Sequence, residues 1–112
     1  PSTFSIADKK SNSWGYSGSW GTEADYNAMR RDFEKMKKFT DAGYGVIIGE
    51  YGVCHNTDGG KHVMKKGTDK FLRSVKDLSS EMGYCAMIWD CSDWFNRKTQ
   101  SYNYDFLKDI YD

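Results

Sequence analysis

Apolar positions recur every three or four residues in the first third of the chain, with basic and acidic residues between them. This spacing predicts one amphipathic helix from about Glu23 to Ala42. Thr22 is the expected N-cap, because its hydroxyl can accept a hydrogen bond from the first helical turn. Gly43 is the expected residue after the last turn, where glycine adopts left-handed dihedral angles without strain.

A second helical pattern runs from about Thr68 to Met82 and stops at Gly83, and a short third pattern runs from about Tyr104 to Tyr111. Both patterns place apolar residues on one stripe, as expected for helices that pack on a core. The apolar residues of these stripes are Phe71, Leu72, Val75, Leu78 and Met82, followed by Phe106, Leu107 and Ile110.

Two near-continuous apolar runs, Gly45 to Tyr51 and Tyr84 to Trp89, predict short buried strands. Because a helix-length segment separates them, we expect them to pair in parallel as a right-handed βαβ unit. Such a pair leaves two edges unpaired and cannot cover both of its faces. The chain is therefore expected to belong to a larger α/β sheet or barrel. The segments 1–21, 54–66 and 91–103 are expected to be loops.

An acidic residue lies near the C-terminal end of each predicted strand: Glu50 inside the first strand, and Asp90 directly after the second. Side chains alternate along a strand, so Val46, Ile48 and Glu50 are expected to share one face. The corresponding set on the second strand is Cys85, Met87 and Trp89.

The balance of charge narrows the classes of partner. The chain has 112 residues, enough for one small domain, with 16 basic and 16 acidic residues. This balance argues against sequence-independent binding of nucleic acid, which requires a basic surplus.

No apolar run approaches the roughly 20 residues of a membrane span. Because the first residue is Pro1 rather than Met, we expect a chain that has been processed, excised or cut from something longer.

Three cysteines, Cys54, Cys85 and Cys91, form no CxxC pair and indicate neither a disulfide framework nor a zinc site. Cys85 lies inside an apolar run and is expected to be a small core residue. A pairing of Cys54 with Cys91 stays open. The segment from His55 to His62 holds two histidines and an aspartate, but their spacing matches no common zinc pattern, which favours a polar loop.

Glu50 and Trp89 are the strongest candidates for chemistry. If both strands belong to a barrel, these residues stand at its C-terminal mouth on neighbouring strands. A carboxylate beside an indole ring is typical of sugar processing, because the ring stacks on a pyranose while the carboxylate attacks or stabilises the anomeric carbon. The alternative is a Glu paired with a buried Arg and a Trp that fills the core. The aromatic content of 16 % fits either a stacking surface or a Trp-rich core.

The motif VIIGEYG at residues 46–52 closely resembles the seventh-strand nucleophile motif of family 5 glycoside hydrolases, the cellulase and β-mannanase group. The Glu after Ile-Gly is the nucleophile of that family, so the resemblance implies this role for Glu50. The motif SWGT at residues 19–22 and the helix after it resemble the region between the sixth and seventh strands. The motif YCAMIWD at residues 84–90 resembles the eighth strand, whose Trp forms the platform under the sugar.

The resemblance covers nearly the whole chain. It implies an α/β fold that is the C-terminal part of a (β/α)8 TIM barrel, with the last two strands and the last three helices. Residues 1–21 would be the loop after strand six, and residues 22–112 would run from helix six to helix eight. Such a piece is incomplete on its own, because the whole barrel takes roughly 250 residues.

The family's general acid/base Glu follows an Asn and usually precedes a Pro, and this chain has no such tripeptide. The resemblance therefore implies one part of a secreted, retaining β-glycanase that hydrolyses β-1,4-linked glucan by double displacement, with the acid/base Glu outside this chain. We expect the chain alone to be inactive and its partner to be the N-terminal remainder of the barrel, separate or missing. The resemblance implies no metal, no organic cofactor, and no nucleic-acid or membrane partner.

Five residues are implied to contact the sugar. Trp89 would be the platform, Trp14 and Trp20 would approach from the loop that borders the cleft, and His55 and Asn56 would lie at its mouth. Trp14 and Trp20 are equally suited to pinning that loop to the fold. The catalytic role implied by the resemblance rests on Glu50.

Two other functions stay open. A non-catalytic carbohydrate-binding module would stack sugars on its Trp residues, although such modules are typically all-β and this chain has a β/α pattern. An incomplete barrel could also be an interaction piece that assembles with copies of itself or with its missing half.

Overall fold

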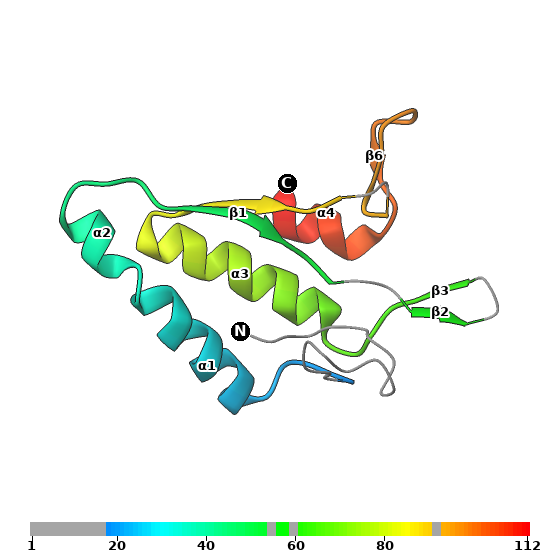
Figure 1. Cartoon of the computed structure of the whole chain (residues 1–112). Coiled ribbons are helices and arrows are strands. Elements are labelled where there is room, and N and C mark those ends of the chain that lie inside the picture. The colour runs from blue at the N-terminus through cyan, green and yellow to red at the C-terminus, as the bar shows by residue number, and fades with distance from the viewer. Residues whose placement is uncertain (1–17, 54–55, 59–60, 91–92) are drawn as a thin grey trace.

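The computed structural model describes residues 18–53, 56–58, 61–90 and 93–112. They form a mixed α/β fold (Figure 1). Among the described residues, no helix is long and apolar enough to cross a membrane. The elements are α1 (Glu23–Glu34), α2 (Lys37–Asp41), β1 (Ile47–Tyr51), β2 (Asn56–Asp58), β3 (Lys61–Val63), α3 (Thr68–Met82), β4 (Cys85–Ile88), β5 (Phe95–Asn96), β6 (Ser101–Tyr102) and α4 (Asp105–Tyr111).

Strands β1 and β4 lie side by side and parallel, with α3 connecting them through the β2–β3 segment, which confirms the predicted pairing. Ile47 lies opposite Cys85, and the backbone N–H of Cys85 donates to the carbonyl of Val46 at 3.0 Å. At the other end, the N–H of Trp89 donates to the carbonyl of Tyr51 at 2.7 Å. The ladder therefore extends one residue beyond β4.

Helix α3 has the predicted bounds. Its stripe of Leu72, Val75 and Leu78 is buried, which explains why this amphipathic segment packs on the strands. Gly83 ends the helix with φ of 72°, a left-handed conformation that glycine adopts without steric cost. The chain then turns directly into β4, so the length of α3 sets where β4 begins.

The single helix predicted from Glu23 to Ala42 is wrong, because the structure interrupts it between α1 and α2. The N–H of Met36 donates to the carbonyl of Phe33, three residues back, and this tighter turn breaks the helical ladder. Neither helix contains a fully buried residue, so packing does not enforce a continuous axis. The predicted N-cap is confirmed: Thr22 accepts from the N–H of Asp25 at 3.2 Å, and the Asp25 carboxylate accepts from the N–H of Thr22 at 2.9 Å.

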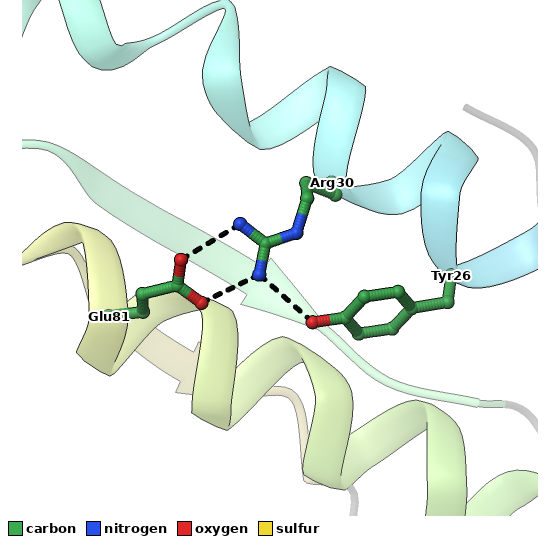
Figure 2. A network of polar contacts seen from close by, with 3 residues as sticks. All are labelled: Tyr26, Arg30 and Glu81. Carbon is green, nitrogen blue, oxygen red and sulfur yellow. Dashed lines mark hydrogen bonds and ion pairs between the residues drawn. The ribbon is translucent and has the colours of Figure 1, made fainter.

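A salt bridge joins α1 to α3. Arg30 donates to both carboxylate oxygens of Glu81, at 2.8 and 2.7 Å, and to the hydroxyl of Tyr26 at 3.0 Å (Figure 2). The hydrogen bonds from Arg30 lower the pKa of the Glu81 carboxyl and raise the pKa of the guanidinium. Both charged side chains are substantially exposed, so the bridge orients α1 on α3 more than it stabilises the fold.

Two antiparallel hairpins were not predicted and occupy segments expected to be loops. Strands β2 and β3 pair within residues 56–63, and β5 pairs with β6. Their strands have only two or three residues each, too few for an apolar alternation to be visible in the sequence. In the β5–β6 turn, the side chain of Asn96 accepts from the N–H groups of Lys98 and Thr99 at 3.0 and 3.2 Å.

The core lies between α3, α4 and the strands. It consists of Val53, Leu72, Trp94, Leu107 and Ile110. Half-buried aromatic residues extend it at both ends, and they include Trp20, Phe71, Tyr51 and Tyr111. Five of these nine side chains come from α3 and α4, so these two helices supply more than half of this set.

A close backbone approach joins the first described segment to α3. The N–H of Trp20 donates to the carbonyl of Lys66 at 3.1 Å. Gly67 follows with φ of 90°, and a Cβ atom there would lie 1.8 Å from the carbonyl oxygen of Trp20. Only glycine fits this position without moving backbone, because that separation is far inside van der Waals contact.

The two faces of the β1–β4 pair differ. Helices α1, α3 and α4 all lie on one side of the strands (Figure 1). On the other side Ile47, Met87 and Trp89 are 64, 49 and 56 % exposed. This confirms that the two strands cannot cover both faces, and it corrects the prediction that Cys85 is a core residue, since Cys85 is exposed. We call this side the open face; its residues are Ile47, Glu50, Cys85, Met87 and Trp89.

Candidate active site

Glu50 lies at an irregularity in β1. Ile48 is paired with Ala86 and Tyr51 with Ile88, so β1 advances three residues where β4 advances two. One residue of β1 is therefore extra, as in a β-bulge, and Gly49 and Glu50 lie within it. Bulges of this kind redirect a side chain and are frequent beside active sites.

The bulge corrects the predicted arrangement of faces. Val46 is buried and Ile48 half-buried, so both belong to the helix-covered side, while Ile47 is exposed. The predicted shared face of Val46, Ile48 and Glu50 assumed strict alternation through Gly49, and the bulge breaks that alternation. Glu50 is exposed, like Ile47 and unlike Ile48 and Tyr51, so we group it with the open face.

Trp89 lies on the same open face as Glu50. It follows β4, and its N–H is bonded to the carbonyl of Tyr51, the residue after Glu50. Its side chain is 56 % exposed, so a flat indole surface is available beside the strand ends. Glu50 is exposed as well, and it is the only carboxylate among the open-face residues. A carboxylate beside an exposed indole can bind and attack a sugar ring.

Asp90 has a structural role. Its carboxylate accepts a hydrogen bond from the backbone N–H of Trp94 at 2.9 Å. Trp94 is 4 % exposed and its ring lies 6.0 Å from that of Tyr104. Asp90 therefore fixes the backbone of Trp94, whose side chain lies in the core.

Trp20 is placed against the core. Its ring meets that of Phe71 edge to face, with centroids 5.5 Å apart, and it packs against the buried cluster. Together with the hydrogen bond to Lys66, these contacts match the alternative in which Trp20 pins its loop to α3. The structure does not bring Trp20 together with Glu50 and Trp89 on the open face.

Of the remaining predicted site residues, only Asn56 lies among the described residues. Asn56 opens β2, where it lies opposite Val63. Trp14 and His55 lie outside the described residues, as do Cys54 and Cys91, whose pairing stays open. In the described ranges, no three His, Cys, Asp or Glu residues gather where they could hold a metal ion.

One contact beside the site has no signal in the sequence. The hydroxyl groups of Tyr51 and Tyr111 lie 2.7 Å apart and share a hydrogen bond, although 60 residues separate them. Burial is the main cause that raises the pKa of both hydroxyls, so the pair stays protonated at neutral pH. The bond ties the end of β1 to the last residue of α4.

Comparison with solved structures relates this chain to a glycoside hydrolase. No family model matches the chain, and no curated protein matches it. The chain is similar to the solved structure of a tri-modular GH5 (subfamily 4) endo-β-1,4-glucanase from Bacillus licheniformis, with a TM-score of 0.61 and 27 % sequence identity. The match covers 78 % of this chain and 16 % of that chain, so this chain spans less than a fifth of the glucanase's length. The similarity supports a GH5-like relationship and, through it, a relationship to glycan hydrolases.

Proposed function

We propose that this chain forms the C-terminal part of the barrel of a retaining glycoside hydrolase that cleaves β-1,4-linked glucan. The observation that supports the proposal is that Glu50 and Trp89 are both exposed and come from the C-terminal ends of two parallel strands. Carboxyl ends of parallel strands are where such folds hold their active sites. The similar solved structure, an endo-β-1,4-glucanase, supports the choice of reaction and polymer.

In the proposed mechanism Glu50 is the nucleophile. Its carboxylate attacks the anomeric carbon, and the bond to the leaving sugar breaks as an acid/base Glu outside this chain protonates the leaving oxygen. The same group then removes a proton from water, which releases the sugar from Glu50 with retained configuration. Trp89 stacks on the sugar and holds it for both steps.

The proposal requires a partner polypeptide. A retaining enzyme needs its second carboxyl group about 5 to 5.5 Å from the nucleophile, and Glu50 is the only carboxylate that the described residues place on the open face. We propose that the N-terminal remainder of the barrel supplies it, either from a longer chain or from a separate one. Exposed Ile47 and Met87 support this, since a barrel interior would cover them. Because the proposed substrate is an extracellular polymer, we also propose that the enzyme is secreted.

A hybrid enzyme tests the proposal. The matching segment of the B. licheniformis glucanase would be replaced by this chain, and hydrolysis of carboxymethyl cellulose would be measured for the hybrid and for this chain alone. We expect the hybrid to be active, the lone chain to be inactive and Glu50→Gln to abolish activity, with Asp90→Asn as the matched control that keeps the reacting carboxylate. A hybrid still active with Glu50→Gln would disprove the role of Glu50.

The alternative of a non-catalytic sugar-binding surface is favoured by one observation, the exposure of the Trp89 side chain. Titrating the chain with cello-oligosaccharides while following Trp fluorescence separates the two functions. Binding that is unchanged by Glu50→Ala, together with an inactive hybrid, would support a surface that stacks sugars without cleaving them.

A further inference from the structure

The end of strand β1 is held at three points by one residue, Tyr51. Its carbonyl accepts from the N–H of Trp89 at 2.7 Å, its ring packs against the core, and its hydroxyl bonds that of Tyr111 at 2.7 Å. Tyr51 directly follows Glu50 and closes the bulge, because regular pairing resumes at Tyr51 and Ile88. Whatever fixes Tyr51 therefore also fixes the backbone that carries Glu50.

The opposite end of the bulge is held by strand pairing and by half-buried Ile48. Ile48 pairs with Ala86, and no contact of Gly49 replaces packing there, since a Cβ atom at Gly49 would meet nothing within 4 Å. The hydroxyl bond to Tyr111 couples this end of β1 to a helix whose residues Leu107 and Ile110 are buried.

We infer that the Tyr51–Tyr111 hydroxyl pair is a positioning device for Glu50, tying the bulged end of β1 to α4 and so setting the direction in which the carboxylate leaves the strand. The inference deepens the proposed function and rests on it, because positioning matters only for a carboxylate that reacts. Preorganisation of this kind is needed when a nucleophile must meet an anomeric carbon within a fraction of an ångström. Tyr51 and Tyr111 are positioning residues, since neither is expected to touch the sugar.

The test uses the chain itself and removes only hydroxyl groups. Tyr51→Phe, Tyr111→Phe and the double variant keep the packed rings, and Tyr84→Phe is the matched control. The hydroxyl of Tyr84, which directly precedes β4, donates to the carbonyl of Phe33 in α1 at 2.9 Å, so this variant also loses one long-range bond, but at the other end of the strand pair from Tyr51. For each variant, NMR would give the amide exchange rate of Trp89 and the backbone order parameter and χ1 populations of Glu50.

We expect Tyr111→Phe to accelerate exchange of the Trp89 amide about 2- to 10-fold, as for the loss of one hydrogen bond. The order parameter of Glu50 should fall from about 0.85 toward 0.6, and its χ1 populations should broaden. The double variant should resemble each single variant, because the two hydroxyl groups form one bond. Tyr84→Phe should lower the melting temperature and leave Glu50 unchanged.

Two results would overturn the inference. One is a Glu50 that keeps its order parameter and rotamer in both single variants and in the double variant. The other is a Tyr84→Phe variant that alters Glu50 as much as Tyr111→Phe does, since the effect would then be general loosening. No readout involves turnover, so failure of the hybrid enzyme and failure of the positioning device are seen in separate experiments.

Discussion

Apolar residues on the two faces of the β1–β4 pair have opposite environments, because they are buried on one face and exposed on the other. On the covered side, Val46 and the α3 stripe are buried, as their apolar character predicts. On the open face, Ile47 and Met87 are equally apolar and yet 64 and 49 % exposed. The apolar residues of the covered side are therefore already buried. Those of the open face are suited to contact a further layer, which the described residues do not supply.

The covered side stabilises the fold, whereas the open face holds the residues that are proposed to act on a ligand. The covered side joins α3, α4 and the strands into one interior through residues such as Leu72 and Leu107, both fully buried. The open face holds Glu50 and Trp89, and their neighbours gain little from burial in this chain. Substitutions on the two sides should consequently differ in kind, with stability on one and assembly or sugar binding on the other.

The largest expected effect contrasts the two faces directly. Leu72→Ala should lower the free energy of unfolding by about 2 to 5 kcal/mol, because a fully buried side chain leaves a cavity. Ile47→Ala, which removes apolar atoms from the open face, should change it by less than about 0.5 kcal/mol. Urea denaturation followed by circular dichroism measures both. Equal losses would show that the open face is packed in solution and would break the comparison.

A smaller effect is expected at the margin of the covered side. Helix α1 has no fully buried residue, so its start depends on the Thr22–Asp25 capping box more than on packing. Thr22→Ala should cost about 1 kcal/mol of stability, whereas Thr22→Ser should keep the cap. Chemical denaturation of the three proteins tests this. No loss in Thr22→Ala would mean that tertiary contacts alone hold α1.

The smallest effect concerns pH and the bridge between α1 and α3. Arg30 lowers the pKa of the Glu81 carboxyl in the folded chain below its ordinary value of 4.5. The bridge therefore stabilises the fold above that ordinary value, and its contribution is lost as the pH falls through the lower, folded pKa. In Arg30→Met the free energy of unfolding should fall less steeply as the pH is lowered into the acid range. At neutral pH the free energy of unfolding should fall only slightly, because both groups are exposed.

Unfolding free energies measured between about pH 6 and pH 2 would reveal this slope. Arg97→Met is the control, since it removes the same charge from the exposed β5–β6 turn. An Arg30→Met variant whose acid limb equals that of the original chain would show that the bridge carries no net coupling.

The sequence predicts those elements whose apolar pattern matches their local environment. Helix α3 begins and ends where its stripe and Gly83 indicate, and the parallel pair follows from two apolar runs flanking it. The interruption near Met36 was missed because the apolar spacing continues across it, while the tightened turn is a backbone event. The pattern also could not distinguish a strand covered on both sides from one covered on a single side, which is why Cys85 was misplaced.

The sequence predicts candidate residues for the site but not their geometry. Glu50 and Trp89 were identified by their positions at strand ends, but the bulge that sets the face of Glu50 leaves no trace in a two-residue alternation. The Tyr51–Tyr111 bond joins residues 60 apart, and nothing local in either segment indicates it. Contacts of that range depend on tertiary packing, which pattern alone does not contain.

The close approach at Gly67 has a consequence for the search for related chains. With φ of 90° and the Trp20 carbonyl 1.8 Å from where a Cβ would stand, this position admits no side chain while the strand-like bridge between Ser19 and Lys66 persists. Any homologue that retains this crossing should retain a glycine 47 positions after its counterpart of Trp20, allowing for insertions between them. That pair is a backbone signature, independent of catalysis, by which diverged relatives can be aligned even when they have lost the acidic residue at the strand end.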